Sequence, residues 1–116
     1  MRARLRLRLY FATGEFIGPG KAELMALIAE TGSISAAAKR MGMSYKRAWS
    51  LAETLNAMFA KPLIASARGG ARGGGAHLTE TGAAVLAAYR ALQHSAEMGG
   101  AEAIAALEAL LPDTDM

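Results

Sequence analysis

The sequence of 116 residues contains no cysteine, so disulfide bonds and thiolate metal sites are excluded. No run approaches the roughly 20 consecutive apolar residues that a transmembrane helix needs. The first ten residues, MRARLRLRLY, are too charged for a secretory signal. With 53% apolar residues, one compact domain of this length can form a core without cross-links. We therefore expect a soluble, cytoplasmic protein.

Residues suited to catalysis or metal binding are also scarce. The two histidines, His77 and His94, lie far from any pair of acidic residues at ligand spacing. Ser33, Ser35 and Ser44 are better explained as helix caps and turn residues than as nucleophiles. The sequence therefore predicts that the protein is not an enzyme and that it holds no cofactor and no metal ion.

A loop of sequence GPGK at residues 18–21 invites comparison with a phosphate loop. In a Walker A motif a glycine stands five residues before the last glycine, and serine or threonine follows the lysine. Those two positions hold Glu15 and Ala22 here. Nucleotide binding by this loop is therefore excluded.

Charge is divided unevenly along the chain. Residues 1–78 contain twelve lysines or arginines and four acidic residues, for a net charge of +8. Residues 79–116 contain one arginine and six acidic residues, for a net charge of −5. This asymmetry indicates a basic face for a polyanion and an acidic part that faces something else. The alternative is that both are simply solvated surfaces.

Residues 33–59 have the spacing of two helices joined by a tight turn. Small or apolar residues recur at helical period in both halves: Ile34, Ala37, Ala38 and Met41, then Ala48, Leu51, Ala52 and Leu55. Gly42 stands where the first helix must end with φ > 0, and Ser44 can cap the second helix. Because Ala37 and Ala38 allow a close crossing, the stretch predicts a helix-turn-helix, which presents its second helix to DNA.

The region before this unit predicts two short strands and a helix. Residues 3–11 alternate between apolar and basic, typical of a half-buried strand with Arg4, Arg6 and Arg8 on its outer face. These arginines either face phosphates or, in the preferred interpretation, cover a solvated sheet face. A turn at residues 13–15, a returning strand at 16–17 and a helix from residue 19 or 20 to 30 follow.

A second hairpin is predicted directly behind the helix pair. Residues 63–67 and 76–79 are short strands around a basic, glycine-rich tip, so residues 63–79 are expected to form the wing of a winged helix-turn-helix. Arg68 and Arg72 supply positive charge, and the glycines let the backbone pass close to a sugar-phosphate wall. The alternative is a floppy surface loop.

The C-terminal part is predicted to be two helices, residues 80–97 and 101–111, separated by Gly99 and Gly100. They carry more apolar residues than so small a core can bury, and pairing with a second copy would cover the excess. We therefore divide the chain into a winged helix-turn-helix DNA-binding domain, residues 1–78, and C-terminal dimerisation helices, residues 79–116. The expected fold is mainly α with a small β component.

The outward face of the second helix, near its N-terminus, is the part expected to enter the major groove. Trp49 either contacts a thymine methyl group or a sugar, the preferred interpretation, or anchors the core against the wing. The residues expected to contact DNA are Ser44, Tyr45, Lys46, Arg47, Trp49 and Ser50 from this helix, Ser33, Ser35 and Lys39 from the first helix, and Arg68 and Arg72 from the wing.

Four motifs occur together in this chain: TGSIS at residues 31–35, SYKRAW at 44–49, the glycine-rich wing, and LTETG at 78–82. Together they resemble the N-terminal DNA-binding domain of the molybdate-responsive transcriptional regulators of the ModE family, and less closely LysR-type helix-turn-helix domains. The resemblance implies a homodimer, formed through flanking helices, that binds a palindromic operator in double-stranded DNA near metal-transport or cofactor genes. Full-length members add molybdate-binding domains that this chain lacks, so a separate molybdate-binding protein is a possible partner.

Two other kinds of binding module are left open. The RGG-like residues 68–75 would suit RNA or single-stranded nucleic acid, but stacking platforms need several exposed aromatic rings. Phe11, Phe16 and Phe59 are expected to be buried instead. Winged helices also serve as protein-interaction modules.

Overall fold

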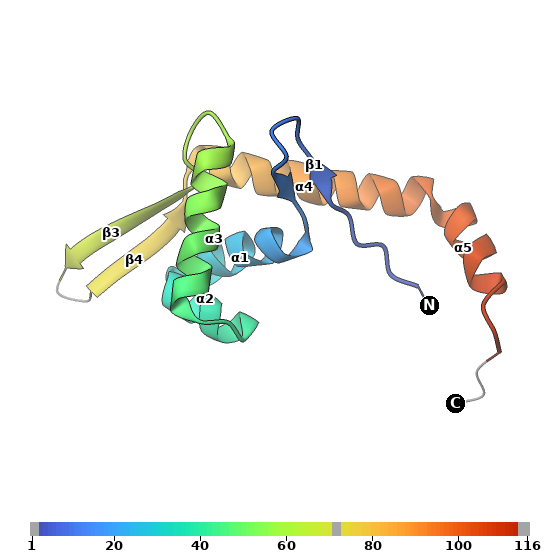
Figure 1. The fold of residues 1–116 in the computed structure, drawn as a ribbon, viewed down its shortest axis with the longest axis horizontal. Helices are drawn as coiled ribbons and strands as arrows, with labels where there is room; N and C mark the ends of the chain where they lie inside the picture. Colours follow the sequence, from blue (N-terminus) through green and yellow to red (C-terminus); the bar gives the residue numbers. More distant parts are fainter. Residues whose placement is uncertain (1–2, 71–72, 114–116) are drawn as a thin grey trace.

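The computed structural model describes residues 3–70 and 73–113. Its elements in chain order are β1 (Leu9–Tyr10), β2 (Phe16–Ile17), α1 (Pro19–Thr31), α2 (Ile34–Met41), α3 (Tyr45–Met58), β3 (Ile64–Gly70), β4 (Gly73–Leu78), α4 (Glu80–Gly99) and α5 (Ala101–Ala109) (Figure 1). The strands form two antiparallel hairpins, β1 with β2 and β3 with β4. The predicted fold class, mainly α with a small β component, is confirmed.

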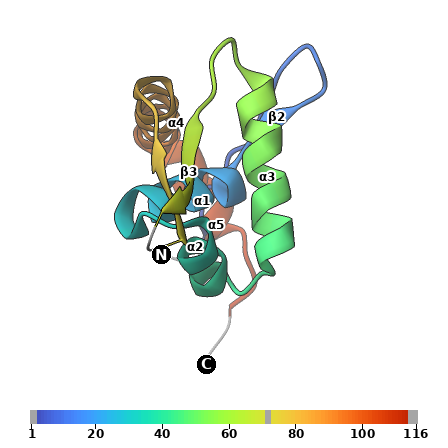
Figure 2. The ribbon, with the colours of Figure 1, turned by 90° about the vertical axis from the view of Figure 1, so that its left-hand side faces the viewer.

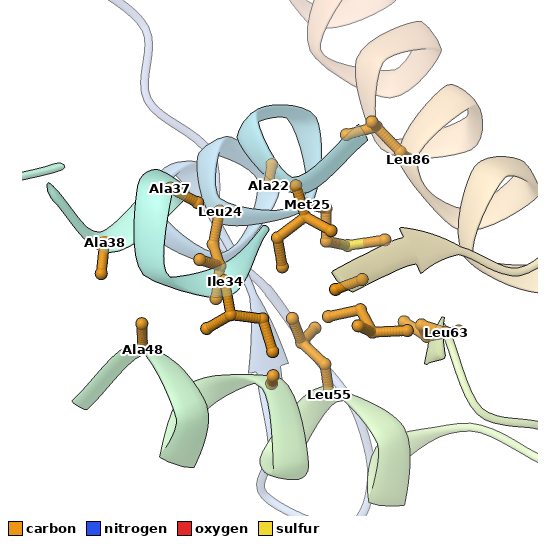
Figure 3. Close-up of a cluster of buried hydrophobic side chains, with 14 of the residues drawn as sticks. Ala22, Leu24, Met25, Ile34, Ala37, Ala38, Ala48, Leu55, Leu63 and Leu86 are labelled. Carbon is orange, nitrogen blue, oxygen red and sulfur yellow. The ribbon is translucent and has the colours of Figure 1, made fainter. Parts of the chain in front are cut away.

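The core lies between helices α1, α2 and α3 and the base of the β3–β4 hairpin (Figure 3). Its fully buried large side chains are Leu24, Met25, Ile28, Leu55 and Leu63. Among the positions predicted to face inward, Leu27, Met41 and Leu51 are half-buried at the edge of this cluster. Full burial of a leucine or isoleucine side chain contributes about 1.5–3 kcal/mol, so these contacts hold the three helices together.

The strand predicted over residues 3–11 is wrong for most of its length. Only Leu9 and Tyr10 form strand β1, in register with β2 as Leu9↔Ile17 and Tyr10↔Phe16. Residues 3–8, the blue segment leading to the N-terminus in Figure 1, are bonded to helices instead of a strand. The predicted alternation of exposure is confirmed there, because residues 3, 5 and 7 are half-buried and Arg4, Arg6 and Arg8 are exposed.

We call residues 3–8 the N-terminal strap, because side chains of α4 and α5 hold their backbone. The Tyr89 hydroxyl donates to the carbonyl oxygen of Leu7 at 2.7 Å, and Gln93 Nε2 donates to that of Leu5 at 2.6 Å. The amide of residue 3 donates to Glu108 Oε2 at 2.9 Å. Burial raises the pKa of Tyr89 above its ordinary value, against the opposing charge of an arginine in the strap. The hydroxyl therefore stays protonated and able to donate at neutral pH.

Helix α4 begins on the core and continues beyond it. Thr79 Oγ1 accepts a hydrogen bond from the Gly82 amide at 3.0 Å, which caps the helix, and Leu86 and Tyr89 are buried. No residue of α5 is buried. Large apolar side chains are consequently exposed at the end remote from the wing: Leu92, Met98, Leu107, Leu110 and Leu111. No helix within the described ranges is both long enough and apolar enough to cross a bilayer.

The three phenylalanines expected to be buried are only half-buried. Phe16 packs against Tyr10 with ring centroids 5.2 Å apart, and Phe11 meets Phe59 edge-to-face at 5.6 Å. Ile17 of the β1–β2 hairpin is buried in the core, whereas Phe11 and Phe59 pack against the edge of the core. Part of each ring therefore remains open to water.

Candidate nucleic-acid interface

The turn between α2 and α3 is fixed by local hydrogen bonds. Gly42 has a left-handed backbone with φ of 71°, which glycine adopts without steric cost. The Met43 amide donates to the Ala38 carbonyl oxygen at 3.0 Å, closing the end of α2. Ser44 Oγ accepts from the Arg47 amide at 3.1 Å and so caps α3. The predicted turn glycine and serine cap are confirmed.

Small side chains let the two helices cross closely. Ala38 of α2 and Ala48 of α3 are 2% and 0% exposed and point toward each other (Figure 3). Ala52, one turn further along α3, is also buried. Because this side of α3 packs inward, its opposite side faces outward. Figure 2 shows α3 on the flank of the molecule opposite α4.

The outward side of α3 carries most of the side chains predicted to contact DNA from this helix. Tyr45 is 54% exposed at the first position of the helix. Exposed alongside it are Ser44, Lys46, Arg47, Ser50 and Glu53. Within the described part of the chain, no ion pair engages Lys46 or Arg47. Two cations and the positive end of the helix dipole are thus available to an anionic partner.

Trp49 has a mixed position. It is half-buried, and its buried part packs against the edge of the core. The indole therefore anchors α3 while leaving part of its ring at the surface. Its contact with a base or sugar stays a prediction.

Helix α2 adds a smaller set of polar groups. Ser33 is half-buried, and its Oγ accepts from the Ala36 amide at 3.0 Å, so this hydroxyl is engaged as a helix cap. Ser35 and Lys39 are exposed. The neighbouring Arg40 pairs with a glutamate of α1. Lys39 is therefore the basic residue of α2 that remains available on the surface.

The wing is the β3–β4 hairpin, paired from Ile64↔Leu78 towards its tip. The Ala76 amide of β4 donates to the Gly32 carbonyl oxygen at 2.9 Å, which ties the wing to the turn between α1 and α2. Arg68 belongs to β3, whereas Arg72 lies outside the described residues. The predicted hairpin behind the helix pair is confirmed.

Asn56 of α3, which the sequence did not single out, holds the backbone at the start of the wing. Asn56 Oδ1 accepts from the amides of Leu63 and Ile64 at 2.9 and 2.8 Å, and its Nδ2 donates to the Ile64 carbonyl oxygen at 3.0 Å. One side chain of α3 thereby holds the first residues of the wing. A polar residue four positions after Ala52 on the apolar stripe was the available signal.

The histidines lie apart on exposed surfaces. His77 is on β4 and His94 on α4. Across residues 3–70 and 73–113, no group of three or more His, Asp or Glu side chains is close enough together to hold a metal ion.

Helices α2 and α3, their glycine turn and the hairpin behind them make this molecule a winged helix-turn-helix protein. Residues 21–83 match the family described as bacterial regulatory helix-turn-helix protein, lysR family, and the chain belongs to this family. These are DNA-binding transcription regulators, so the expectation that the protein is not an enzyme is confirmed.

Several curated relatives of the chain carry molybdenum in their names. The chain is 46% identical over 81 residues to the molybdenum-pterin-binding protein MopB of Rhodobacter capsulatus, covering 70% of this chain and 30% of that protein. It is 38% identical over 89 residues to the DNA-binding transcriptional dual regulator ModE of Escherichia coli K12, covering 77% and 34%. The chain thus spans about a third of the length of these relatives, and the resemblance to the ModE family is confirmed.

A solved structure gives the same fold in a DNA complex. The CbnR DNA-binding domain in the crystal structure of its complex with DNA is 27% identical and superposes with a TM-score of 0.58. The match covers 76% of this chain and 95% of that chain.

Proposed function

We propose that this protein is a sequence-specific regulator that binds double-stranded DNA with the N-terminal half of α3 in the major groove. The observation that carries the proposal is the outward cluster of Tyr45, Lys46 and Arg47 around the start of α3. Lys46 and Arg47 can donate to guanine acceptors or phosphates, and Tyr45 to phosphates. Residues 1–78 form the DNA-binding part in this proposal, with Arg68 and Arg72 of the wing following the minor groove or flanking phosphates.

The regulator acts as a homodimer on a palindromic operator in this proposal, with residues 79–116 providing the contact between copies. Support comes from the apolar surface of the C-terminal helices, where Leu107 and Leu110 are 65% and 82% exposed. Monomeric proteins rarely leave such patches uncovered. Two-fold symmetry would place two α3 helices on half-sites about one turn of DNA apart.

The proposed targets are genes of molybdate or metal transport, or of cofactor synthesis. The names of the relatives, molybdenum-pterin-binding proteins and ModE regulators, support this assignment. We also propose a molybdate-binding protein as a partner, on the support of the same relatives' names.

Replacing Lys46 with alanine is expected to weaken binding to the cognate operator about ten- to a hundredfold, because a good contact to a base edge contributes about 1–3 kcal/mol. The operator would first be selected from a random duplex library, and affinities measured by gel-shift titration at several salt concentrations. Lys61→Ala, an exposed change beyond the C-terminal end of α3, is the matched control. Full operator affinity of the Lys46 variant would contradict the assigned orientation of α3.

Arg72→Ala is expected to act differently from Lys46→Ala. A contact to phosphate carries no sequence information, so binding to all duplexes should weaken to a similar degree, and the salt slope should fall by about one. Competition between duplex and single-stranded oligonucleotides tests the alternative of an RNA or single-strand binder. Preference for the single strand, or no salt-dependent duplex binding at all, would favour one of the other two binding modules.

Replacing both Leu107 and Leu110 with glutamate is expected to convert the dimer into a monomer, because four buried charges would face each other across the contact. Both leucines are exposed in the single chain, so its fold should persist. Light scattering gives the mass in solution, and circular dichroism checks the helices. Methionine at both positions keeps the apolar surface and should leave the dimer intact; a monomeric parent protein would refute this contact.

A further inference from the structure

A basic cavity lies beside α3, the recognition helix of the function proposed above, on the side of the β1–β2 hairpin. It has a volume of about 520 Å³ and is lined by the strap, the hairpin, the start of α1, the end of α2 and α3. Four of its lining side chains are cationic: Arg6, Arg8, Lys21 and Arg47. Within the described ranges none of its lining residues is acidic. The cavity therefore concentrates positive charge contributed by three separate parts of the chain.

Lys21 is the buried member of this set. It is 7% exposed, donates from Nζ to the Phe16 carbonyl oxygen at 2.9 Å and lies 3.7 Å from the centre of the Phe16 ring. No carboxylate in the described part of the chain forms an ion pair with it. Buried charges in proteins are normally paired. A buried ammonium with one hydrogen bond and no counter-charge is a group suited to receive an anion.

The backbone at the start of α1 adds further donors. Gly18 is the N-cap and offers no side-chain cap, and Pro19 has no amide hydrogen. The first-turn amides of Gly20 and Lys21 form no hydrogen bond to any carbonyl outside the helix in the described ranges. A Cβ on Gly18 would lie 3.0 Å from Arg8 Cγ. Glycine at this position therefore lets an arginine of the strap approach the open amides.

We propose that this cavity binds a phosphate-class oxyanion. Cationic side chains from the strap and α3, a buried ammonium and unbonded helix amides together provide the donors that such an anion needs. The anion is either a free inorganic oxyanion or a phosphodiester of bound DNA; the second source rests on the function proposed above. Arg47 belongs to both the cavity and the exposed face of α3, so an anion in the cavity would position the recognition helix.

The first experiment uses inorganic phosphate and the protein without DNA. If the anion is a free inorganic oxyanion, saturable shifts of the Gly20 and Lys21 amide resonances are expected in an NMR titration of the full chain. The double variant Arg6→Gln/Arg8→Gln should weaken this binding at least about tenfold, because it removes two of the charge-assisted contacts. The control Arg4→Gln/Arg90→Gln removes the same charge from exposed positions outside the cavity and should leave the affinity unchanged.

The second experiment uses duplex DNA and separates the two sources. If the anion is a DNA phosphate, free phosphate gives no saturable shift, but the Arg6/Arg8 variant lowers the salt slope of duplex binding by about two. The single variant Arg6→Gln, whose side chain makes no hydrogen bond within the described residues, repeats the test if the double variant unfolds. Equal effects of the Arg6/Arg8 and Arg4/Arg90 variants, or no effect in either experiment, overturn the proposal. A protein that binds phosphate but no duplex would refute the function and leave this site standing.

Discussion

Replacement of Gly82 by alanine is expected to lower the free energy of unfolding by about 3 kcal/mol, at the upper end of typical overpacking costs. A Cβ at this position would lie 2.9 Å from the carbonyl carbon and 3.2 Å from the Cα of Leu63, and closer still to its carbonyl oxygen. The obstacle is backbone, which cannot rotate away as the end of a side chain would. Helix α4 or the start of the wing must therefore shift.

The Leu63 backbone is held from two sides. Its amide donates to Asn56 Oδ1 at 2.9 Å, and its carbonyl oxygen accepts from the Thr79 amide at 2.9 Å. Its side chain is fully buried. A shift large enough to admit a methyl group would break these bonds or open the core.

Urea unfolding followed by circular dichroism measures the effect of Gly82→Ala. Gly99→Ala is the matched control, because Gly99 lies in the same helix and nothing stands within 4 Å of its added Cβ. That variant should be neutral or stabilised by up to about 1 kcal/mol. Wild-type stability of the Gly82 variant would mean that α4 does not pack against the base of the wing as described.

Asn56→Ala is expected to cost about 3 kcal/mol, because it removes three hydrogen bonds and leaves buried amides and a carbonyl without partners. The loss should be concentrated at the start of the wing, since Asn56 bonds the backbone of Leu63 and Ile64. Hydrogen exchange of these two amides would accelerate in the variant.

Two comparisons sharpen the Asn56 test. Asn56→Asp keeps the acceptor for both amides but loses the donor, so it should retain part of the stability and the slow exchange. Glu53→Ala changes an exposed residue of the same helix and should alter stability by less than about 0.5 kcal/mol. Unchanged exchange at Leu63 and Ile64 in Asn56→Ala would rule out the role assigned to Asn56.

The sequence predicts well those features that depend on neighbouring residues. Ser33, Gly42 and Ser44 act within one turn of helix, so the helix-turn-helix can be located from local spacing alone. The wing follows from two short apolar runs around glycines. The outward residues of α3 follow by elimination once Ala48, Ala52 and Leu55 are assigned to the core; their contacts with DNA stay a prediction.

Contacts between distant parts of the chain cannot be predicted from local sequence patterns. Alternation in the strap predicts a strand, but its partner is a helix more than 80 residues away in sequence, which offers side-chain donors instead of a strand edge. In the sequence, Lys21 is an ordinary lysine in a loop that lacks the Walker A pattern. Only the structure shows that its ammonium group contacts the carbonyl oxygen and the ring of Phe16. The same holds for Gly82, whose small size matters only because the backbone of Leu63 lies against it.

The N-terminal strap also bears on the distance between the two α3 helices of the proposed dimer. By fastening residues 3–8 to Tyr89, Gln93 and Glu108, it braces the part of α4 that projects past the core and fixes its direction relative to α3. In the proposed dimer, the direction of α4 relative to α3 sets the distance between the two recognition helices. Shortening the strap would then change the spacing of half-sites that the dimer prefers, without altering any residue that faces a base.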